Sequence, residues 1–462
     1  MIVVSHRGPF GFSVGDDGAL DANRGPGGLA GTLHLLATSS DALREATCIS
    51  AALGDGDRRA MASPELDRLQ STLGTDVRFV ALDAAQHRLH YEVVSNEILW
   101  FLFHGIFDLP RAPAFGPEFR DAWDAFVAVN ETFAAATADA ASDGEIVLVQ
   151  DYPLVLVPGL LADRRPDLRV SYFAHTPFCG PDGIAVLPDD AAAAVCRSMG
   201  ARPSGFHTTR WARAFEDSAR VVLGGDGRVA PAFAAPLGPD PEGLATIAAS
   251  AAVQEAAAEL DELVGDRKLV FRSDRIDLTK NIVRSFEAYD IFLAEHPEWR
   301  ERVVFVAMLT SSRETVPEYI AYRKDVEESA ARVNERWTTP SWQPLVVDTR
   351  DDFEQTVAGF RRYDVLVVNP VKDGLNLVAK EGPLVNTRDG VLCLSPEAGA
   401  FAELGHAALA VHPYDVGQNA AALHRALTMD DAERRTRAEQ LRTAAGARTP
   451  QTWLRDLVAH AR

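Results

Sequence analysis

The feature that most constrains the fold is an alternation, along the whole chain, of short β-branched runs with longer segments rich in Ala and Leu. This alternation is typical of parallel sheets covered by helices. It therefore predicts an α/β protein of the doubly wound kind. The runs that predict strands are residues 2–5, 77–82, 146–150, 168–174, 268–272, 303–309, 344–347, 365–368 and 390–394.

A segment rich in Pro and Gly, residues 235–241, separates two sets of predicted strands and indicates a linker. The chain has 462 residues, about three times the usual size of one domain. We expect two Rossmann-like, doubly wound domains facing each other across a cleft. Their predicted bounds are residues 1–238 and 239–448, and a last helix, residues 449–462, would cross back to the first domain.

Charge and composition exclude several classes of function. The formal net charge of −20 argues against general binding to nucleic acid or anionic membranes. Hydrophobic residues make up 47% of the chain, but no run approaches the ~18 residues of a membrane span. The start at Met1 has no basic region before its strand-like run, so we expect no signal peptide and a cytoplasmic protein. The scattered cysteines predict small buried side chains, with no disulfide framework or zinc site.

The turn after the 365–368 strand carries the pattern of a nucleotide site. It runs from Val371 to Glu381 and leads into an apolar segment that predicts a helix. Asp373 stands in the turn, Gly374 would relieve its backbone, and helix N–H groups suit a diphosphate. Glu381 lies where a carboxylate can accept bonds from ribose hydroxyls. The alternative is an ordinary connection with a solvated acid at each end.

Polar groups also follow strands in the first half. Arg7 can clamp a phosphate, and the pair Gly27-Gly28 before an apolar helix lets the backbone approach an oxyanion. Tyr91 and Trp100 belong to an aromatic-rich segment that is either core or the wall of an acceptor site. A surface role for Arg7, bonded to local carbonyls, is the alternative.

Two neighbouring strands carry Asp151 and His175 at their carboxyl ends, where open α/β sheets bind ligands. Capping or packing is the alternative role for each residue alone. After the 268–272 strand, Arg275 and Lys280 offer two fixed cations for a leaving diphosphate. The alternative there is surface pairing with the nearby Asp274 and Asp277.

In order and spacing, these motifs resemble those of the trehalose-6-phosphate synthase family, retaining glucosyltransferases of the two-Rossmann GT-B architecture. The likeness covers nearly the whole chain. It is carried by Val4-Ser5-His6-Arg7, Gly27-Gly28-Leu29, Asp151-Tyr152, His175-Thr176-Pro177-Phe178, Arg275 to Lys280, Thr310-Ser311-Ser312-Arg313 and Asp373-Gly374-Leu375-Asn376-Leu377-Val378-Ala379-Lys380-Glu381.

The resemblance implies a role for each matching residue. The phosphate of an acceptor glucose 6-phosphate would be bound by Arg7, Tyr91, Trp100 and Arg313. The donor diphosphate would be bound by Arg275, Lys280 and the N–H groups of Asn376, Leu377 and Val378. Donor-glucose hydroxyls would bond Asp373 and His175, with Asp151 near the reacting sugars and Glu381 on the ribose. The transfer would retain configuration without a covalent glycosyl-enzyme, metal or cofactor, and small molecules would be the partners, with a homo-oligomer possible.

Two departures from the family pattern limit this transfer of roles. The chain has Ser50-Ala51-Ala52-Leu53 where members often carry an acceptor-site Trp. The resemblance therefore constrains the identity of the acceptor less than the class of the donor. Our alignment places Asp351 beside the donor base, with Thr356 one turn later. A carboxylate can accept two bonds from the N1–H and N2–H₂ edge of guanine, an edge that uracil lacks, so we expect GDP-glucose over UDP-glucose. The alternative is that Asp351 caps the following helix.

Three rival functions stay open from the sequence. A pseudo-glycosyltransferase of the validoxylamine 7′-phosphate synthase type shares the segment Pro383-Leu384-Val385-Asn386. A glucosylglycerol-phosphate synthase is compatible with the missing acceptor-site Trp. A sugar-phosphate sensor without catalysis belongs to a different class, and the complete set Arg275, Lys280 and Glu381 argues against it.

Overall fold

The protein divides into two compact units, joined twice by the chain. The computed structural model describes residues 1–15, 18–25, 28–38, 43, 45–224 and 229–461. Unit 1 consists of Met1–Pro236 and Pro450–Arg462, and unit 2 of Leu237–Thr449. The unit bounds fall a residue or two from those predicted around the linker and the last helix.

Unit 1 is built on a seven-stranded parallel sheet in the order β5-β4-β1-β6-β7-β8-β9. From β1 the chain winds to one edge through β4 and β5, then returns to β6 and winds to the other edge. The order reverses between β1 and β6, and this switch point is where such sheets bind ligands. The strands are β1 (Ile2–Ser5), β4 (Thr47–Ala51), β5 (Asp76–Val80), β6 (Ile146–Gln150), β7 (Arg169–Ala174), β8 (Ser204–Phe206) and β9 (Phe233–Ala234).

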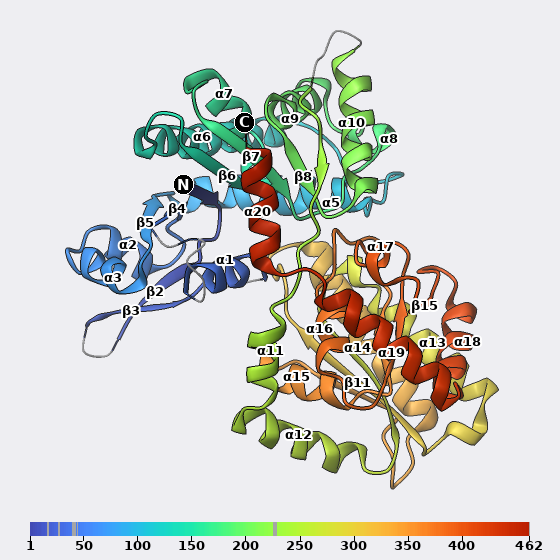
Figure 1. The fold of residues 1–462 in the computed structure, drawn as a ribbon. Coiled ribbons are helices and arrows are strands. Elements are labelled where there is room, and N and C mark those ends of the chain that lie inside the picture. Colours follow the sequence, from blue (N-terminus) through green and yellow to red (C-terminus); the bar gives the residue numbers. More distant parts are fainter. Residues whose placement is uncertain (16–17, 26–27, 39–42, 44, 225–228, 462) are drawn as a thin grey trace. The chain divides into compact units, whose positions relative to one another are not determined.

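Helices and one hairpin complete unit 1 (Figure 1). The antiparallel hairpin joins β2 (Phe10–Val14) to β3 (Leu20–Arg24). The last helix, α20 (Pro450–His460), packs on β7 and contributes the fully buried Trp453. The other helices are α1 (Gly28–Thr38), α2 (Asp55–Met61), α3 (Glu65–Leu73), α4 (Ala84–His87), η1 (Arg88–Leu99), α5 (Trp100–His104), α6 (Pro117–Ala140), η2 (Tyr152–Leu154), α7 (Val157–Arg164), α8 (Pro181–Ile184), α9 (Asp189–Ala201) and α10 (Thr209–Leu223).

Unit 2 contains a six-stranded parallel sheet in the order β12-β11-β10-β13-β14-β15. In order along the chain this is 3-2-1-4-5-6, the strand order of dinucleotide-binding Rossmann folds. Its switch point lies between β10 and β13, so groups that follow these two strands meet at one edge. The strands are β10 (Lys268–Arg275), β11 (Val303–Thr310), β12 (Leu345–Asp348), β13 (Val365–Val368), β14 (Val391–Leu394) and β15 (Leu409–Ala410).

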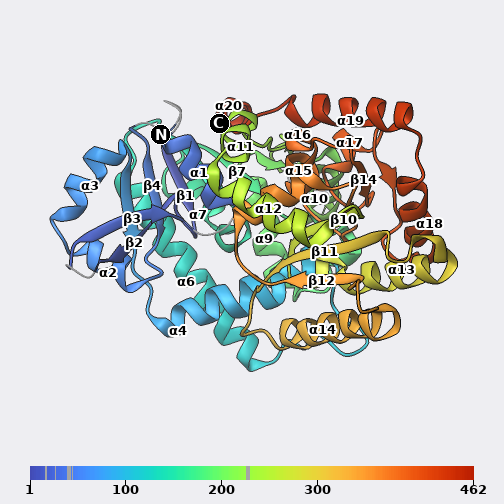
Figure 2. The ribbon, with the colours of Figure 1, turned by 90° about the horizontal axis from the view of Figure 1, so that it is seen from below.

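The helices of unit 2 cover its sheet, and Figure 2 shows α13 and α18 side by side. Their buried apolar faces and the strands form the core of this unit. The helices are α11 (Pro241–Ala248), α12 (Ala251–Val264), η3 (Leu278–Lys280), α13 (Ile282–Glu295), η4 (Pro297–Trp299), α14 (Pro317–Trp337), α15 (Phe353–Arg362), α16 (Val378–Val385), α17 (Phe401–Leu404), α18 (Val416–Leu427) and α19 (Asp431–Gly446).

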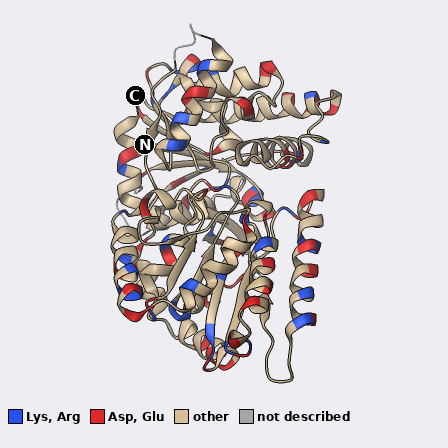
Figure 3. Ribbon diagram, turned by 90° about the vertical axis from the view of Figure 1, so that its right-hand side faces the viewer, with Lys and Arg blue, Asp and Glu red and all other residues tan. Residues whose placement is uncertain are grey.

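Charged residues stand mainly on helices and loops, while most of the strand surface is uncharged (Figure 3). Among the described residues, no helix combines the length and apolar character that a membrane crossing requires. The cysteines are free and buried, as the sequence predicted: Cys48, Cys179, Cys196 and Cys393.

Candidate functional site

A cationic cluster lies at the switch point of unit 2, where β10 and β13 end. Arg275 is the last residue of β10, Lys280 ends the short helix η3, and Asp373 belongs to the turn after β13. The Lys280 Nζ lies 2.5 Å from the Asp373 Oδ2, and both side chains are mostly buried. Burial alone would lower the pKa of Lys280, but Asp373 and then Asp274 outweigh it and raise the pKa. Lys280 is therefore a fixed cation at neutral pH.

A buried guanidinium holds the segment that carries Lys280. Arg272 is 0% exposed, and one of its Nη atoms donates to the Lys280 carbonyl at 2.8 Å. The same side chain pairs with Asp274 at 2.7 Å and donates to Ser285 at 2.6 Å. Because each guanidinium nitrogen has an acceptor inside the fold, the turn after β10 is held in place by the protein itself.

Asp277 gathers two further cations at this edge. Its carboxylate is 0% exposed, accepts a hydrogen bond from Arg313 at 2.7 Å and lies 3.9 Å from Arg275. Burial would raise the pKa of Asp277, yet the attraction of Arg313, then Arg275 and Lys280, lowers it well below its usual range. Asp277 is thus ionised at neutral pH. The alternative for Arg275 and Lys280 was surface pairing with Asp274 and Asp277. Arg275 does lie 3.9 Å from Asp277, but the carboxylates are buried, since the Asp277 side chain is 0% exposed and that of Asp274 5%.

The turn after β13 is tied together by Asp373 and Asn376. The Asp373 carboxylate accepts bonds from the Leu375 N–H and the Asn376 side-chain amide, each at 3.2 Å. Asn376 has a left-handed backbone, with φ of 77°, and its side chain accepts a bond from the Ala379 N–H at the start of α16. Gly374 was expected to relieve this turn, but the left-handed residue is Asn376.

The amide groups predicted for the diphosphate open α16. Leu377 is the residue before the helix and Val378 its first residue. A helix leaves its first N–H groups without partners inside the helix, which suits an anion. Glu381 lies in the first turn of α16 and is partly buried. These groups belong to the same unit as Arg275 and Lys280, and they follow the neighbouring strand.

The residues predicted for the base lie at the start of α15. Thr356 is partly buried, with its hydroxyl 3.3 Å from that of Ser273 in β10, so it stands beside the switch-point strand. Asp351 is exposed. The alternative that Asp351 caps the helix is wrong, since Asp352 accepts the capping bond from the Gln355 N–H at 3.0 Å.

In unit 1, Asp151 and His175 meet beside the switch point between β1 and β6. The Asp151 Oδ1 accepts a hydrogen bond from the His175 N–H at 3.0 Å, and the imidazole lies 3.1 Å from the Gln150 side-chain oxygen. Asp151 adopts φ of 68°, a strained value for a non-glycine residue. Burial lowers the pKa of His175 to about 3, so its imidazole is neutral at physiological pH.

The aromatic candidates stand on a helix with an unusual hydrogen-bond pattern. Residues 88–99 form a π-helix, in which the Trp100 N–H donates to the Ser95 carbonyl five residues back. Such helices often mark functional sites. Tyr91 stacks on the His6 ring, with 4.2 Å between centroids, and the Arg7 guanidinium lies 5.5 Å from its centroid. Trp100 approaches Tyr152, which follows Asp151, with 5.8 Å between ring centroids.

A pocket of about 280 Å³ opens beside Arg7. Ala51 and Leu53 line it, in the segment where the acceptor-site Trp of the resembling family would stand. Both side chains are smaller than that of Trp, which leaves room next to the guanidinium. Gly28 opens α1, and Gly27 lies outside the described residues.

The structure thus assembles two groups of predicted residues. Unit 2 brings together the cations and the α16 turn, including Arg313, which was predicted for the acceptor phosphate. Unit 1 brings Arg7 to Tyr91 and Asp151 to His175. Sequence reasoning missed Arg272, His6 and the organising role of Asp277. Each stands within three residues of a predicted site residue, and His6 also belongs to the Val4-Ser5-His6-Arg7 motif.

Two doubly wound units in one chain, with a cationic site at the nucleotide-binding edge of the second, define a glycosyltransferase of the GT-B architecture. The chain belongs to glycosyltransferase family 20, whose family model matches residues 2–462.

Relatives with assigned names agree with this family. An "Alpha,alpha-trehalose-phosphate synthase [UDP-forming]" of Schizosaccharomyces pombe is 30% identical over 470 residues, covering 98% of this chain and 88% of the relative. A "Bifunctional trehalose-6-phosphate synthase/phosphatase" of Thermoproteus tenax is 34% identical over 385 residues, covering 80% of this chain. That alignment spans about half of the Thermoproteus protein, 51% of its length.

Solved structures have the same fold. An alpha,alpha-trehalose-phosphate synthase (UDP-forming) from Burkholderia vietnamiensis matches with a TM-score of 0.81 and 29% identity, covering 99% of this chain and 98% of the other. A structure described as trehalose-6-phosphate from E. coli bound with UDP-2-fluoro glucose matches with a TM-score of 0.83 and 25% identity, with the same coverage. The predicted GT-B fold class is confirmed.

Proposed function

We propose that this protein transfers glucose from a nucleoside-diphosphate glucose to glucose 6-phosphate, with retention of configuration, and so forms α,α-trehalose 6-phosphate. The observation that carries the proposal is the cationic cluster of Arg275 and Lys280 at the switch point of unit 2. A protein with a net charge of −20 concentrates cations there around buried carboxylates, which suits a diphosphate leaving group.

The cluster would stabilise the charge that develops as the sugar–phosphate bond breaks. Arg275 can offer a planar pair of donors, and Lys280 has three N–H donors, one of which already meets Asp373. A diphosphate can accept from the remaining Lys280 donors without breaking that pair. Asn376, Leu377 and Val378 would add backbone N–H groups. Because these charges are held before the donor binds, they need little rearrangement in the transition state.

We assign the sugar side of the reaction to Asp373, His175 and Asp151. Asp373 can accept a bond from a glucose hydroxyl with the carboxylate that its turn holds in place. A neutral His175 can both donate and accept a hydrogen bond, and the Asp151 contact fixes its backbone. The acceptor hydroxyl would attack from the face that the diphosphate leaves, passing its proton to the leaving phosphate. Glu381 is proposed for the ribose.

For the acceptor phosphate we propose Arg7, Tyr91, Trp100 and Arg313. The pocket beside Arg7 supports a small phosphorylated acceptor in unit 1. Its small lining residues in place of a Trp also favour a second acceptor candidate, glycerol 3-phosphate, which is smaller than a sugar phosphate. Turnover is expected without added metal, since Arg275 and Lys280 supply the positive charge.

For the donor base, UDP-glucose is the better supported proposal. Relatives across the family are named UDP-forming, and these names do not support a preference for GDP-glucose. The penalty against uracil that we expected required a buried Asp351, whereas its side chain is exposed. A cytoplasmic location and a homo-oligomer stay predictions.

A donor and acceptor assay tests the proposal. The purified protein is incubated with UDP-glucose or GDP-glucose and with glucose 6-phosphate or glycerol 3-phosphate, in EDTA. We expect release of UDP and an α,α-linked disaccharide phosphate, identified by NMR. If nucleoside diphosphate is released with glycerol 3-phosphate but not with glucose 6-phosphate, glycerol 3-phosphate replaces glucose 6-phosphate as the proposed acceptor. If none of the donor and acceptor pairs gives release, a cyclitol-coupling enzyme or a sensor is favoured.

A further inference from the structure

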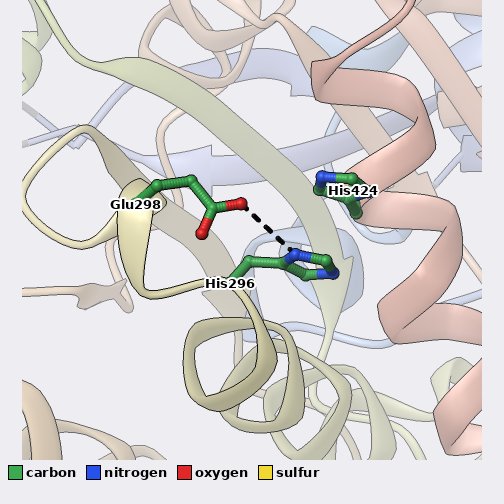
Figure 4. Close-up of side chains that lie close together, drawn as sticks. All are labelled: His296, Glu298 and His424. Carbon is green, nitrogen blue, oxygen red and sulfur yellow. Dashed lines mark ion pairs between the residues drawn. The ribbon is translucent and has the colours of Figure 1, made fainter.

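Three side chains that commonly bind metals come together in unit 2, at a distance from the β10/β13 edge. They are His296, Glu298 and His424. His296 follows the last residue of α13, Glu298 lies in η4, and His424 belongs to the last turn of α18. Figure 4 shows the Glu298 carboxylate and the two imidazoles directed toward one common space.

The spacing of the ligand atoms is close to that of a metal site. The His296 Nδ1 lies 3.4 Å from a Glu298 oxygen, and one ligand atom from each residue lies within 4.8 Å of the others. Two ligands on a tetrahedral Zn²⁺ stand about 3.4 Å apart, given metal–ligand distances near 2.1 Å. The His296–Glu298 edge already has this length. The His424 ring lies parallel to that of His296, with an interplanar angle of 2°, so it must turn out of this stack to direct a nitrogen at the same ion.

The packing of two helices holds the three residues together. At the catalytic edge, the Asn281 side chain, just before α13, donates to the Pro413 carbonyl at 2.6 Å, shortly before α18. The two helices then run side by side (Figures 1 and 2). At their far ends the rings of His296 and His424 stack, with 3.7 Å between centroids. The length of α13 places this group about 20 Å from the catalytic turn.

Charge and exposure at the group also suit a cation. The Glu298 side chain is 54% exposed and that of His296 25%, so an ion can enter and water can fill a remaining coordination position. The neighbouring Arg425 pairs with Glu433 and is therefore occupied elsewhere. Two neutral imidazoles and one carboxylate are the ligands that Zn²⁺ and its neighbours in the transition series prefer.

We propose that His296, Glu298 and His424 bind one divalent transition-metal ion of the Zn²⁺ class, which fastens the carboxyl ends of α13 and α18 to each other. The ion takes no part in glucosyl transfer. It stabilises unit 2, because metal bound only by the folded chain shifts the unfolding equilibrium.

Calorimetric titration tests this site directly. Untagged protein, treated with EDTA and desalted, is titrated with Zn²⁺. We expect one ion per chain and at least about tenfold weaker binding in His424→Ala and in Glu298→Gln, since loss of even an outer-shell partner costs that much. The control is His406→Ala, an exposed histidine of the same unit. Equal weakening in the control, or unchanged binding in both site variants, would overturn the proposal.

A second pair of measurements separates this site from the catalytic one. Co²⁺ bound in the wild-type protein should give the visible absorption of a site with nitrogen and oxygen ligands, lost in His296→Ala. Zn²⁺ should raise the thermal unfolding temperature of wild type but not of Glu298→Gln. The rate of glucosyl transfer measured in EDTA should be the same in wild type and in Glu298→Gln. If Zn²⁺ leaves the wild-type unfolding temperature where it was, the inference fails even if the protein turns over its substrates.

Discussion

Asp277 illustrates how one buried carboxylate organises several cations. Its Oδ1 accepts from the backbone and hydroxyl of Thr279, and its Oδ2 from Arg313. An amide in its place would aim a donor at one of these donors and leave Arg313 without a counter-charge. The carboxylate therefore serves both the stability of unit 2 and the geometry of the site.

We expect Asp277→Asn to lower the free energy of unfolding at pH 7 by on the order of 2 kcal/mol. The folded state depresses the pKa of Asp277, so its contribution is complete above the unfolded value near 3.9 and is lost as pH falls below it. Urea titrations should show that the difference in free energy of unfolding between wild type and Asp277→Asn becomes smaller from pH 7 to pH 3.5. The exposed Asp325→Asn is the control, and equal midpoints at pH 7 would contradict the prediction.

A second residue-scale prediction concerns acid sensitivity at His90. Burial lowers its pKa to about 3, and neither ring nitrogen has a hydrogen-bond partner among the described residues. The unfolded chain takes up a proton near pH 6.5, so stability falls as pH drops below that value. At pH 5, His90→Leu should be more stable than wild type. Between pH 7 and pH 5, the difference between their free energies of unfolding should shift by about 2 kcal/mol in favour of the variant. Urea midpoints at both pH values check this, and an unchanged pH dependence would refute it.

Arg275 is the residue whose removal should cost most in catalysis. Arg275→Ala is expected to lower turnover by ~10²-fold, because a leaving diphosphate loses a fixed cation. Steady-state kinetics with the donor established by the assay measure the effect. Arg332→Ala, an exposed arginine on α14 of the same unit, should turn over normally. A normal rate in Arg275→Ala would remove this residue from the mechanism.

At the scale of elements, the period and composition of the chain predicted the sheets well. The strands at Ile146–Gln150 and Val365–Val368 have the predicted bounds. The strands β8, β9 and β15 were missed, because two or three residues are too few to carry a pattern. The five-residue strands β2, β3 and β4 were missed as well, because none of them is a run of β-branched residues. The π-helix bearing Tyr91 was also beyond prediction, since its side chains follow neither the helical nor the strand period.

The candidate site was predictable where its residues follow strands that the sequence marks by a clear apolar run. Arg275, Lys280 and Asp373 could be placed together because β10 and β13 end at one edge. The burial of Asp274 and Asp277 was not predictable, because it depends on cations from three separate elements. The exposure of Asp351 likewise depends on the cap that Asp352 makes instead.

The turn that contains Asp373 packs closely against the loop that contains Gly399. Gly399 donates to the Asp373 carbonyl at 3.1 Å, and a Cβ on Gly399 would lie 2.0 Å from the Gly374 carbonyl oxygen. Gly399→Ala must therefore displace the turn, and we expect a ~10- to 100-fold loss of kcat/KM. In Gly417→Ala, where a Cβ finds only ordinary contact, the rate should hold. Equal rates in both variants would show that the turn tolerates displacement.

At the scale of the whole molecule, Trp453 links the last helix to unit 1. Its ring is 0% exposed and lies against Phe173 and His175. Trp453→Ala should cost unit 1 about 3 to 5 kcal/mol and lower activity by loosening His175. Differential scanning calorimetry should show the unit 1 transition at a lower temperature and the unit 2 transition unmoved. A shift of both by the same amount would mean that the units unfold as one.

The division of unit 1 along the chain has a consequence for synthesis on the ribosome. Residues 237–449 form a continuous stretch, so this unit can fold as soon as it has been made. The seven-stranded sheet of unit 1 is made earlier, but the contacts of Trp453 with Phe173 and His175 form only once α20 emerges. A nascent chain halted before residue 450 would thus carry a complete unit 2 and an incomplete unit 1, a state in which chaperone capture and degradation compete with completion.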